Sequence, residues 1–215
     1  AEPIVVKTKT NEVKYKDIFF NIIFPSIVIF NNSIKMNLLI RVKSTKTQIR
    51  LSNMDGPLKN LLVIDLTRVL VGPYCTMILS DLGARVIKVE APEIGDDSRK
   101  FGPFIKDYSA YFMSLNRGKE SIALNLKNDE DKKIFEKILS KADILVENFK
   151  PGTLEKWGFG WKDVSKKYPK LIYASASGFG QTGPLKELPA YDMVVQGMGG
   201  LMSVTGHPNS EPTRV

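Results

Sequence analysis

Residues 61–90 carry the clearest pattern of apolar and polar positions in the chain. The largely apolar run 61–67, rich in branched side chains, predicts a buried strand. Apolar residues at helical spacing from Tyr74 to Leu82 predict a helix, which Pro73 can open because its missing N–H is not needed there. Gly83 is a natural stop for that helix, and 86–90 predicts a second strand. A strand, a helix and a strand within thirty residues indicate a βαβ unit, whose strands are parallel.

The same alternation of strands and helices continues to residue 198. Asn128 is a typical N-cap, three acidic residues follow it, and an apolar stripe from Ile134 to Leu139 predicts the buried face of that helix. The alternation predicts an α/β, Rossmann-like fold with a mostly parallel open sheet and flanking helices. The further strands are expected at 121–126, 143–147 and 171–175, and the helices at 108–115, 128–142, 153–157, 163–168 and 191–198, with a long loop over 178–189.

Residues 1–53 differ from the rest of the chain in composition and charge. The formal net charge of the chain is +8, and this leader supplies +6 of it, with nine lysines and arginines against three acidic residues. The basic character therefore says little about a partner of the remaining part. We expect two segments, a poorly ordered leader at 1–53 and a folded domain at 54–215, with Met54 as the native start.

The apolar run 18–30 within the leader is too short for a membrane span, which needs about 20 residues. Lysines precede it, as in a signal peptide, but no small-residue cleavage site follows, so a targeting role stays open as the alternative. Cys75 is the only cysteine, which excludes an internal disulfide and favours a reducing compartment. The only histidine, His207, lies between Gly206 and Pro208 and is typical of a loop, so no metal site is expected.

Ligands of parallel sheets bind outside the carboxyl ends of the strands, which here means residues 68–72 and 91–99. A dinucleotide is the first candidate for such a crevice. The loop after the first strand lacks G-x-G-x-x-G, and the usual cradle for a pyrophosphate is therefore missing.

Several motifs across residues 57–214 occur in an order that points to one family. They are D-L-T-R-V-L-V-G-P, D-L-G-A-R-V-I-K-V-E-A-P, G-D-D-S-R, N-R-G-K-E-S-I-A-L-N-L-K, A-D-I-L-V-E-N-F-K-P-G, S-A-S-G-F-G-Q-T-G-P, A-Y-D and G-L-M-S-V-T-G. In this order they resemble the class III CoA-transferases of the formyl-CoA and carnitine-CoA type. The resemblance implies the N-terminal portion of that family's large domain, with coenzyme A as a substrate and no prosthetic group.

The resemblance also implies the reaction, which is transfer of coenzyme A from an acyl-CoA donor to a small carboxylic acid. Family members use an aspartate that becomes an aspartyl-CoA thioester, a form of covalent catalysis. That aspartate follows the P-T-R motif, here Pro212 to Arg214, and the chain ends at Val215. No residue of this chain is therefore expected to be the nucleophile, and the chain alone is expected to be inactive. An inert CoA- or nucleotide-binding fragment is the non-enzyme alternative.

The positions that resemble the family's coenzyme A site lie mostly at strand ends. Lys127 can meet a phosphate as a flexible point charge, Asn148 offers donors and an acceptor, and Phe149 offers a stacking face. Arg99 and Arg117 can hold either phosphate or structural carboxylates. Four of the loops must bring Val71, Lys127, Asn148 and Tyr191 to a shared hollow. The full candidate set is Arg68, Leu70, Val71, Leu124, Lys127, Asn148, Phe149, Lys150, Lys156, Tyr191 and Asp192.

The sequence departs from parts of this family. Ala91 and Pro189 stand where the formyl-CoA enzymes have an arginine and a lysine, which weakens that particular assignment. The α-methylacyl-CoA racemases of the same family have a histidine at the position of Tyr191, and tyrosine, with an ordinary pKa of about 10, is a poor base. Transfer is therefore favoured over racemisation, and racemase is the same-family alternative, opposed by Tyr191. The resemblance also implies a homodimer at full length, no nucleic acid or membrane partner, and a cytoplasmic location, or a mitochondrial one in a eukaryote.

Overall fold

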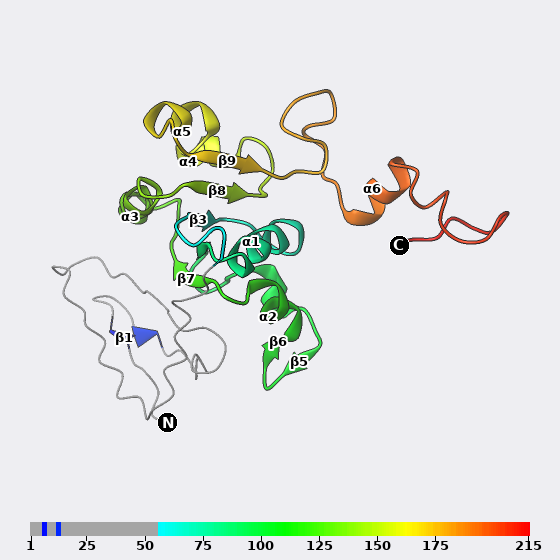
Figure 1. Ribbon diagram of the computed structural model, residues 1–215, viewed down its shortest axis with the longest axis horizontal. Coiled ribbons are helices and arrows are strands. Elements are labelled where there is room, and N and C mark those ends of the chain that lie inside the picture. Colours follow the sequence, from blue (N-terminus) through cyan, green and yellow to red (C-terminus); the bar gives the residue numbers. More distant parts are fainter. Residues whose placement is uncertain (1–5, 8–11, 14–55) are drawn as a thin grey trace.

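The computed structural model describes residues 6–7, 12–13 and 56–215, shown in colour in Figure 1. Two short strands, β1 (Val6–Lys7) and β2 (Glu12–Val13), pair in an antiparallel ladder. The remainder of the leader lies outside the described residues, so its expected disorder and the native start at Met54 stay predictions. No helix among the described residues has both the length and the apolar character that crossing a bilayer requires.

A five-stranded sheet forms the centre of the domain, and every pair of neighbouring strands in it is parallel. The strand order is β7–β4–β3–β8–β9, so the chain moves outward from β3 first to one side and then to the other. In open parallel sheets a reversal of this kind is where ligands usually bind, which here means the crevice position outside the carboxyl ends of β3 and β8. The strands are β3 (Leu62–Asp65), β4 (Arg85–Glu90), β7 (Glu120–Ala123), β8 (Ile144–Glu147) and β9 (Ile172–Ser175).

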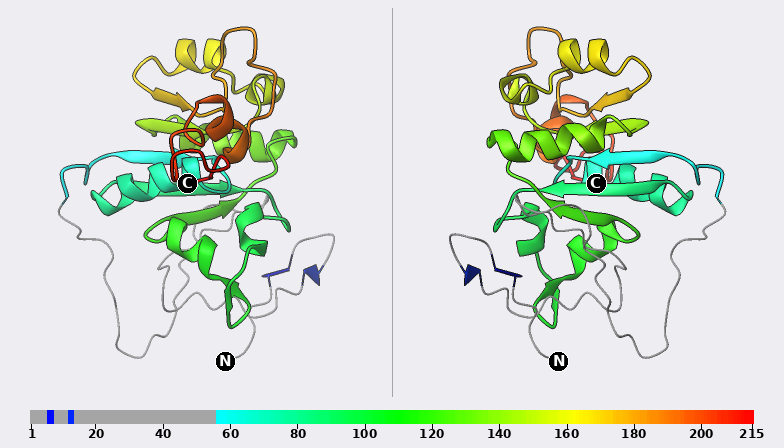
Figure 2. Two further views of the ribbon diagram at one scale, coloured as in Figure 1. Left: turned by 90° about the vertical axis from the view of Figure 1, so that its right-hand side faces the viewer. Right: turned by 90° about the vertical axis from the view of Figure 1, so that its left-hand side faces the viewer.

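Helices flank both faces of the sheet, which confirms the predicted Rossmann-like α/β fold. Figure 2 shows α1 and α3 on opposite sides of the strands. A 3₁₀ turn, η2 (Asp97–Lys100), and a small hairpin of β5 (Phe104–Ile105) and β6 (Tyr108–Ser109) follow β4. The helices are α1 (Val71–Asp81), α2 (Ala110–Asn116), α3 (Asp129–Leu139), α4 (Thr153–Trp157), α5 (Trp161–Lys167) and α6 (Asp192–Met198).

The predicted elements all exist, with shifts at their ends. The helix expected at 108–115 begins later, because Tyr108–Ser109 pairs as β6 and the Ser109 hydroxyl then caps α2 by accepting from the Phe112 N–H at 3.0 Å. Pro73 is the third residue of α1 rather than the first, which costs little because first-turn N–H groups have no partner within the helix. The Asn128 cap is confirmed, since its side chain accepts from the Glu130 N–H at 2.9 Å.

The larger hydrophobic core lies on the sheet face that α3, α4 and α5 cover. The predicted stripe of α3 is confirmed, with Phe135 and Leu139 fully buried. The Phe135 ring meets Phe159 edge-to-face at 4.7 Å, and Ile64 of β3 belongs to the same cluster. Fully burying an apolar side chain contributes about 1.5–3 kcal/mol, so this face supplies most of the hydrophobic stabilisation.

The opposite face, under α1, is unusual because charged side chains alternate with apolar ones in its strands. Asp65 of β3 and Lys88 of β4 point to this side and are almost fully buried. α1 accordingly buries Thr76 and Ser80 together with Met77, and leaves Tyr74, Ile78 and the C-cap residue Leu82 half exposed. The helical spacing of those apolar residues correctly predicts the helix, but the charged sheet beneath it decides which face is buried.

We expect Phe135→Ala to lower the free energy of unfolding by about 3–5 kcal/mol, because the cavity it leaves cannot collapse between the helix and the sheet. Urea unfolding followed by circular dichroism measures this change. Phe104→Ala is the matched control, since that ring is 56% exposed, and we expect a change within about 0.5 kcal/mol. Equal effects of the two substitutions contradict this assignment of the core.

Candidate functional site

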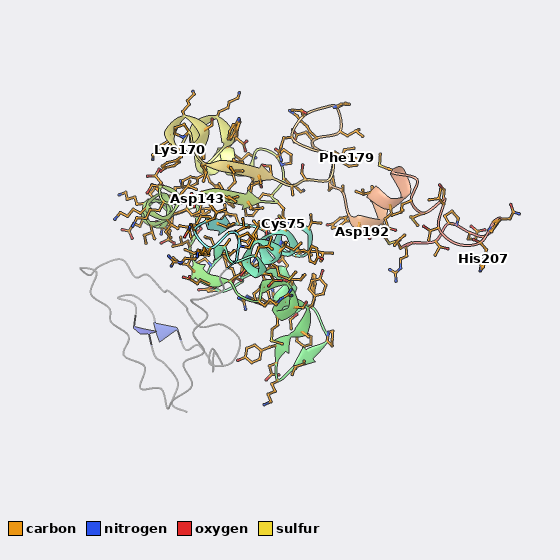
Figure 3. The ribbon with its side chains drawn as sticks, in the orientation of Figure 1. Cys75, Asp143, Lys170, Phe179, Asp192 and His207 are labelled. Carbon is orange, nitrogen blue, oxygen red and sulfur yellow. The ribbon has the colours of Figure 1, made fainter. Side chains whose placement is uncertain are left out.

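The carboxyl ends of β8 and β9 face the segment of residues 176–215 (Figure 1). Figure 1 shows β8 and β9 pointing toward this segment, which leaves the sheet after β9 and carries α6. Figure 3 places Asp192 at the start of α6 and His207 further along, away from the sheet. His207 is exposed in a turn, which confirms its interpretation as a loop residue.

The turn that joins β3 to α1 (the β3–α1 turn, residues 66–70) lies at the reversal of strand order. Five consecutive backbone groups of this turn bond to side chains rather than to other backbone groups. The Thr67 N–H donates to Asp65 Oδ1 at 2.8 Å, and the Thr67 carbonyl accepts from Lys88 Nζ at 2.7 Å. The Arg68 N–H and carbonyl bond to the two ends of the Asn148 amide, each at 2.8 Å.

The fifth of these groups is the Val69 N–H, which donates to Asp96 Oδ1 at 3.1 Å. Val69 has a φ of 69°, in the left-handed region that a β-branched residue rarely adopts. Such a conformation costs about 1–3 kcal/mol and persists only where the surroundings hold it. The next residues, Leu70 and Val71, are 45% and 67% exposed, so the turn presents an apolar edge to solvent.

Close packing at the start of α1 adds a further constraint on the turn. A Cβ at Gly72 would lie 2.3 Å from the Thr67 side chain, so only glycine lets the helix approach β3 this closely. No side chain caps the first turn of α1. The N-terminus of a helix favours anions, because its N–H groups point outward and its dipole is positive there.

A buried ionic cluster lies beneath the turn. Lys88 Nζ is 2.9 Å from Asp96 Oδ2, and Lys119 Nζ is 2.9 Å from Asp65 Oδ2. Lys119 also donates to the Pro73 carbonyl and to Asn116 Oδ1, each at 2.9 Å. The cluster of two lysines and two aspartates is formally neutral and its members are at most 3% exposed. Buried charges of this kind persist because each is paired and hydrogen-bonded.

The electrostatics of the cluster follow from burial opposed by pairing. Burial opposes ionisation of Asp65, but Lys88, Lys119 and two threonine hydroxyls outweigh it and hold the Asp65 pKa below its ordinary value. Asp96 behaves in the same way, with Lys88 and Ser98 holding its pKa low against burial. Burial dominates at Lys119 and lowers the pKa of its ammonium group to about 8.

Glu147, at the end of β8, is the exception among the buried acids. Burial raises its pKa, opposed by the Ser175 hydroxyl that contacts it and by the Phe149 N–H at 2.8 Å. Its carboxylate closes the turn that carries Asn148 and Phe149. Glu147 therefore orders the strand end next to the β3–α1 turn.

The two arginines left open by the sequence hold carboxylates. Arg99 contacts Glu90 through two hydrogen bonds of 2.7 Å, and its guanidinium lies 3.7 Å from the centroid of the Phe112 ring. Arg117 pairs with Asp81. Both roles are structural in this chain.

Three predicted site residues gather at the strand-order reversal. Arg68 bonds to Asn148 through its backbone, and its guanidinium lies 5.5 Å from the centroid of the Phe149 ring and 3.3 Å from Asp97. The Phe149 ring in turn meets Trp157 edge-to-face at 5.2 Å. The Asn148 amide is thus engaged at both ends by Arg68.

The other predicted site residues are more dispersed. Leu70 and Asp192 line one hollow together with α6 residues, and Leu124 is buried in the larger core. Neither this hollow nor a second one around residues 202–212 is lined by Val71, Lys127, Asn148 or Tyr191, so neither is the shared hollow that the sequence predicts. The remaining candidates are exposed on separate loops or helices, namely Val71, Lys127, Lys150, Lys156 and Tyr191.

Sequence reasoning missed the buried charged groups that lie around and beneath the β3–α1 turn. Lys88, Asp96 and Lys119 all lie in motifs that carry the family resemblance, but nothing local assigns them a partner. A usable signal exists for Lys88, which is a charged residue in the interior of an otherwise apolar strand. A buried lysine needs a partner, which predicts an ion pair but not which acid provides it.

Comparison with known proteins gives a consistent result. Residues 58–215 match the family described as CoA-transferase family III. The chain is 58% identical to the acetyl-CoA:oxalate CoA-transferase of Acetobacter aceti and 46% identical to the human succinyl-CoA:glutarate CoA-transferase, over 74% and 75% of this chain. The crystal structure of a CAIB/BAIF family protein from Brucella suis superposes with a TM-score of 0.71 at 44% identity over 74% of this chain.

These matches cover less than half of each relative. The chain spans 41% of the Acetobacter protein, 37% of the human protein and 43% of the Brucella chain. The fold and family are therefore shared over residues that include the β3–α1 turn and the buried cluster.

We expect Asp65→Ala to lower the free energy of unfolding by about 3–5 kcal/mol, because it leaves Lys119 buried without its acidic partner. Urea unfolding measures the loss. Glu120→Gln is the matched control, since it removes the partly exposed partner of Arg85, and a surface pair of this kind contributes about 0.2–1 kcal/mol. A loss at Asp65 no larger than at Glu120 contradicts a paired, buried cluster.

The lowered pKa of Lys119 predicts a pH dependence of stability. Between about pH 8 and the ordinary lysine pKa of 10.5, the unfolded chain holds a proton that the folded chain has released. The free energy of unfolding therefore rises with pH in this window, by at most about 1.4 kcal/mol per pH unit. Urea unfolding of the native chain and of Lys119→Arg across the window measures the difference, since arginine stays charged. Identical pH slopes contradict the lowered pKa.

Proposed function

Because the chain belongs to CoA-transferase family III, we propose that it forms part of an enzyme that moves coenzyme A from an acyl-CoA donor to a small carboxylic acid. The observation that carries the proposal is the family match over residues 58–215, which includes the strained, tightly held β3–α1 turn at the strand-order reversal. Strained residues cluster at ligand-binding sites, and crevices of this kind bind ligands in other open parallel sheets.

The β3–α1 turn and its neighbours have the chemistry that coenzyme A requires. Leu70 and Val71 offer apolar surface, and Phe149 offers a ring already packed between Arg68 and Trp157. The uncapped start of α1 suits a phosphate. Lys127, Lys150 and Lys156 are exposed amines that can reach phosphate groups as flexible point charges.

The substrate class is proposed from the relatives. Those named above act on acetyl-CoA with oxalate and on succinyl-CoA with glutarate, according to their names. A small dicarboxylic acid is therefore the acceptor we propose. Transfer is preferred to racemisation because Tyr191 stands where the racemase resemblance requires a histidine.

We propose that the nucleophile is not among the described carboxylates at the crevice. Asp65 and Asp96 are buried and ion-paired, and each already accepts several hydrogen bonds. Asp192 is exposed but accepts from Gln196 Nε2 at 2.7 Å. The resemblance places the aspartate of the aspartyl-CoA intermediate after Pro212–Arg214. The homodimer and the cytoplasmic location are further parts of this proposal.

Titration calorimetry with coenzyme A tests the binding half of the proposal. We expect the native chain to bind, and Lys127→Ala to weaken binding by about tenfold or less, because the contact is charged but exposed. Lys141→Ala is the matched control, an exposed lysine beyond the far end of α3, and should leave the affinity unchanged. No heat from the native chain contradicts the proposal and favours an inert fragment. Transfer of coenzyme A to oxalate by this chain alone would contradict the placement of the nucleophile.

A further inference from the structure

The β3–α1 turn is held by side chains from three adjacent strands and the loop after β4. Asp65 comes from β3, Lys88 from β4, Asn148 from the end of β8, and Asp96 from the loop before η2. Because these strands pair directly with one another, their relative positions are fixed by the sheet. The conformation of the turn is therefore set by the sheet through four side chains, rather than by its own residues.

At Val69 these contacts hold the backbone in a conformation that valine itself disfavours. A valine released from these contacts favours negative φ, because its branched Cβ crowds the backbone in the left-handed region. The bond from its N–H to Asp96 Oδ1 opposes that release. Asp96 is itself 1% exposed, and its other oxygen is fixed by Lys88. The direction of Leu70 and Val71 follows from the φ of Val69, since they are the next residues.

Asn148 performs a second part of the same task. Its Oδ1 accepts from the Arg68 N–H and its Nδ2 donates to the Arg68 carbonyl, as the backbone of a neighbouring strand would do. The sequence assigns Asn148 a direct contact with coenzyme A, whereas its hydrogen bonds favour an indirect role.

We propose that Asp96 and Asn148 are positioning residues that hold the β3–α1 turn, with Val69 in its left-handed conformation, in the form that binds coenzyme A. The proposal rests on the proposed function for the identity of the ligand. Lys88 forms an ion pair with Asp96 and also donates a hydrogen bond to the Thr67 carbonyl. Substituting either positioning residue releases one side of the turn, and Leu70 and Val71 then leave the positions at which they meet the ligand.

Calorimetry with coenzyme A on the 215-residue chain measures the effect on binding. We expect Asp96→Ala to weaken binding by about tenfold, because the ligand must then supply the free energy that holds Val69 in its left-handed conformation. We expect Asn148→Ala to weaken binding to a similar extent. Ser98→Ala is the matched control, because the Ser98 hydroxyl donates to the same Asp96 Oδ1 at 2.7 Å without touching Val69. We expect less than a twofold change for that variant.

A second substitution separates positioning from general loosening. Glycine adopts the left-handed region without steric cost, so Val69→Gly removes the strain that Asp96 opposes. In the Val69→Gly background, Asp96→Ala should weaken binding by only about two- to threefold. A full tenfold effect in that background overturns the proposal, because the loss would then not pass through Val69.

Nuclear magnetic resonance of the free chain provides a readout that needs no ligand. At positive φ the amide and Hα protons of one residue are close, so Val69 should give a strong intra-residue cross-peak, which weakens in both Asp96→Ala and Asn148→Ala. A cross-peak that persists in both variants overturns the proposal. Should Asp96→Ala fail to fold, Asn148→Ala carries the test, because Asn148 lies outside the buried cluster.

The results separate the positioning role of Asp96 and Asn148 from the proposed binding of coenzyme A. If the native chain binds coenzyme A and the variants bind it equally well, the positioning role is wrong and the proposed function stands. If the native chain does not bind coenzyme A, the proposed function fails, and the ligand assignment of this turn fails with it.

Discussion

The ion pair between Lys88 and Asp96 is the interaction on which the β3–α1 turn depends. It brings a strand interior and a loop together at 2.9 Å, and each partner then uses a remaining atom on the turn, Lys88 on the Thr67 carbonyl and Asp96 on the Val69 N–H. Burying two charges is unfavourable unless they are paired and hydrogen bonds satisfy their remaining atoms. The turn supplies part of that bonding, so the stability of the cluster and the shape of the turn are coupled.

This coupling explains why the two faces of the sheet differ. The face under α3, α4 and α5 is apolar and closely packed, and it stabilises the domain through burial. The face under α1 gives up part of that burial to place Asp65, Lys88 and Glu90 inside the protein. Lys119, the residue before β7, joins the network and bonds to the first turn of α1 as well as to Asp65. The polar face therefore fixes β3, α1 and the crevice relative to one another.

The segment after β9 is less buried than the β3–α1 turn. Its helix α6 is short. Most apolar residues of the segment are about half exposed or more, and Tyr191 and Val204 are 79% and 80% exposed. It meets the β3–α1 turn at Leu70, through a hollow that Asp192 also lines. The β3–α1 turn, on one side of this hollow, is strongly constrained by the sheet, whereas the segment after β9, on the other side, has few buried contacts. This arrangement is expected where a ligand must enter.

The sequence alone determined the order and type of the elements, because apolar spacing, the Asn128 cap and the glycine stops are local signals that each segment carries. It also determined the family, through motifs in a fixed order. It did not determine that α1 buries Thr76 and Ser80, that Arg99 and Arg117 hold carboxylates, or that Val69 is left-handed and bonded to Asp96. Those features join residues up to 36 positions apart in the chain, as Asp81 and Arg117 are, and only the packing of helices and strands brings such residues into contact.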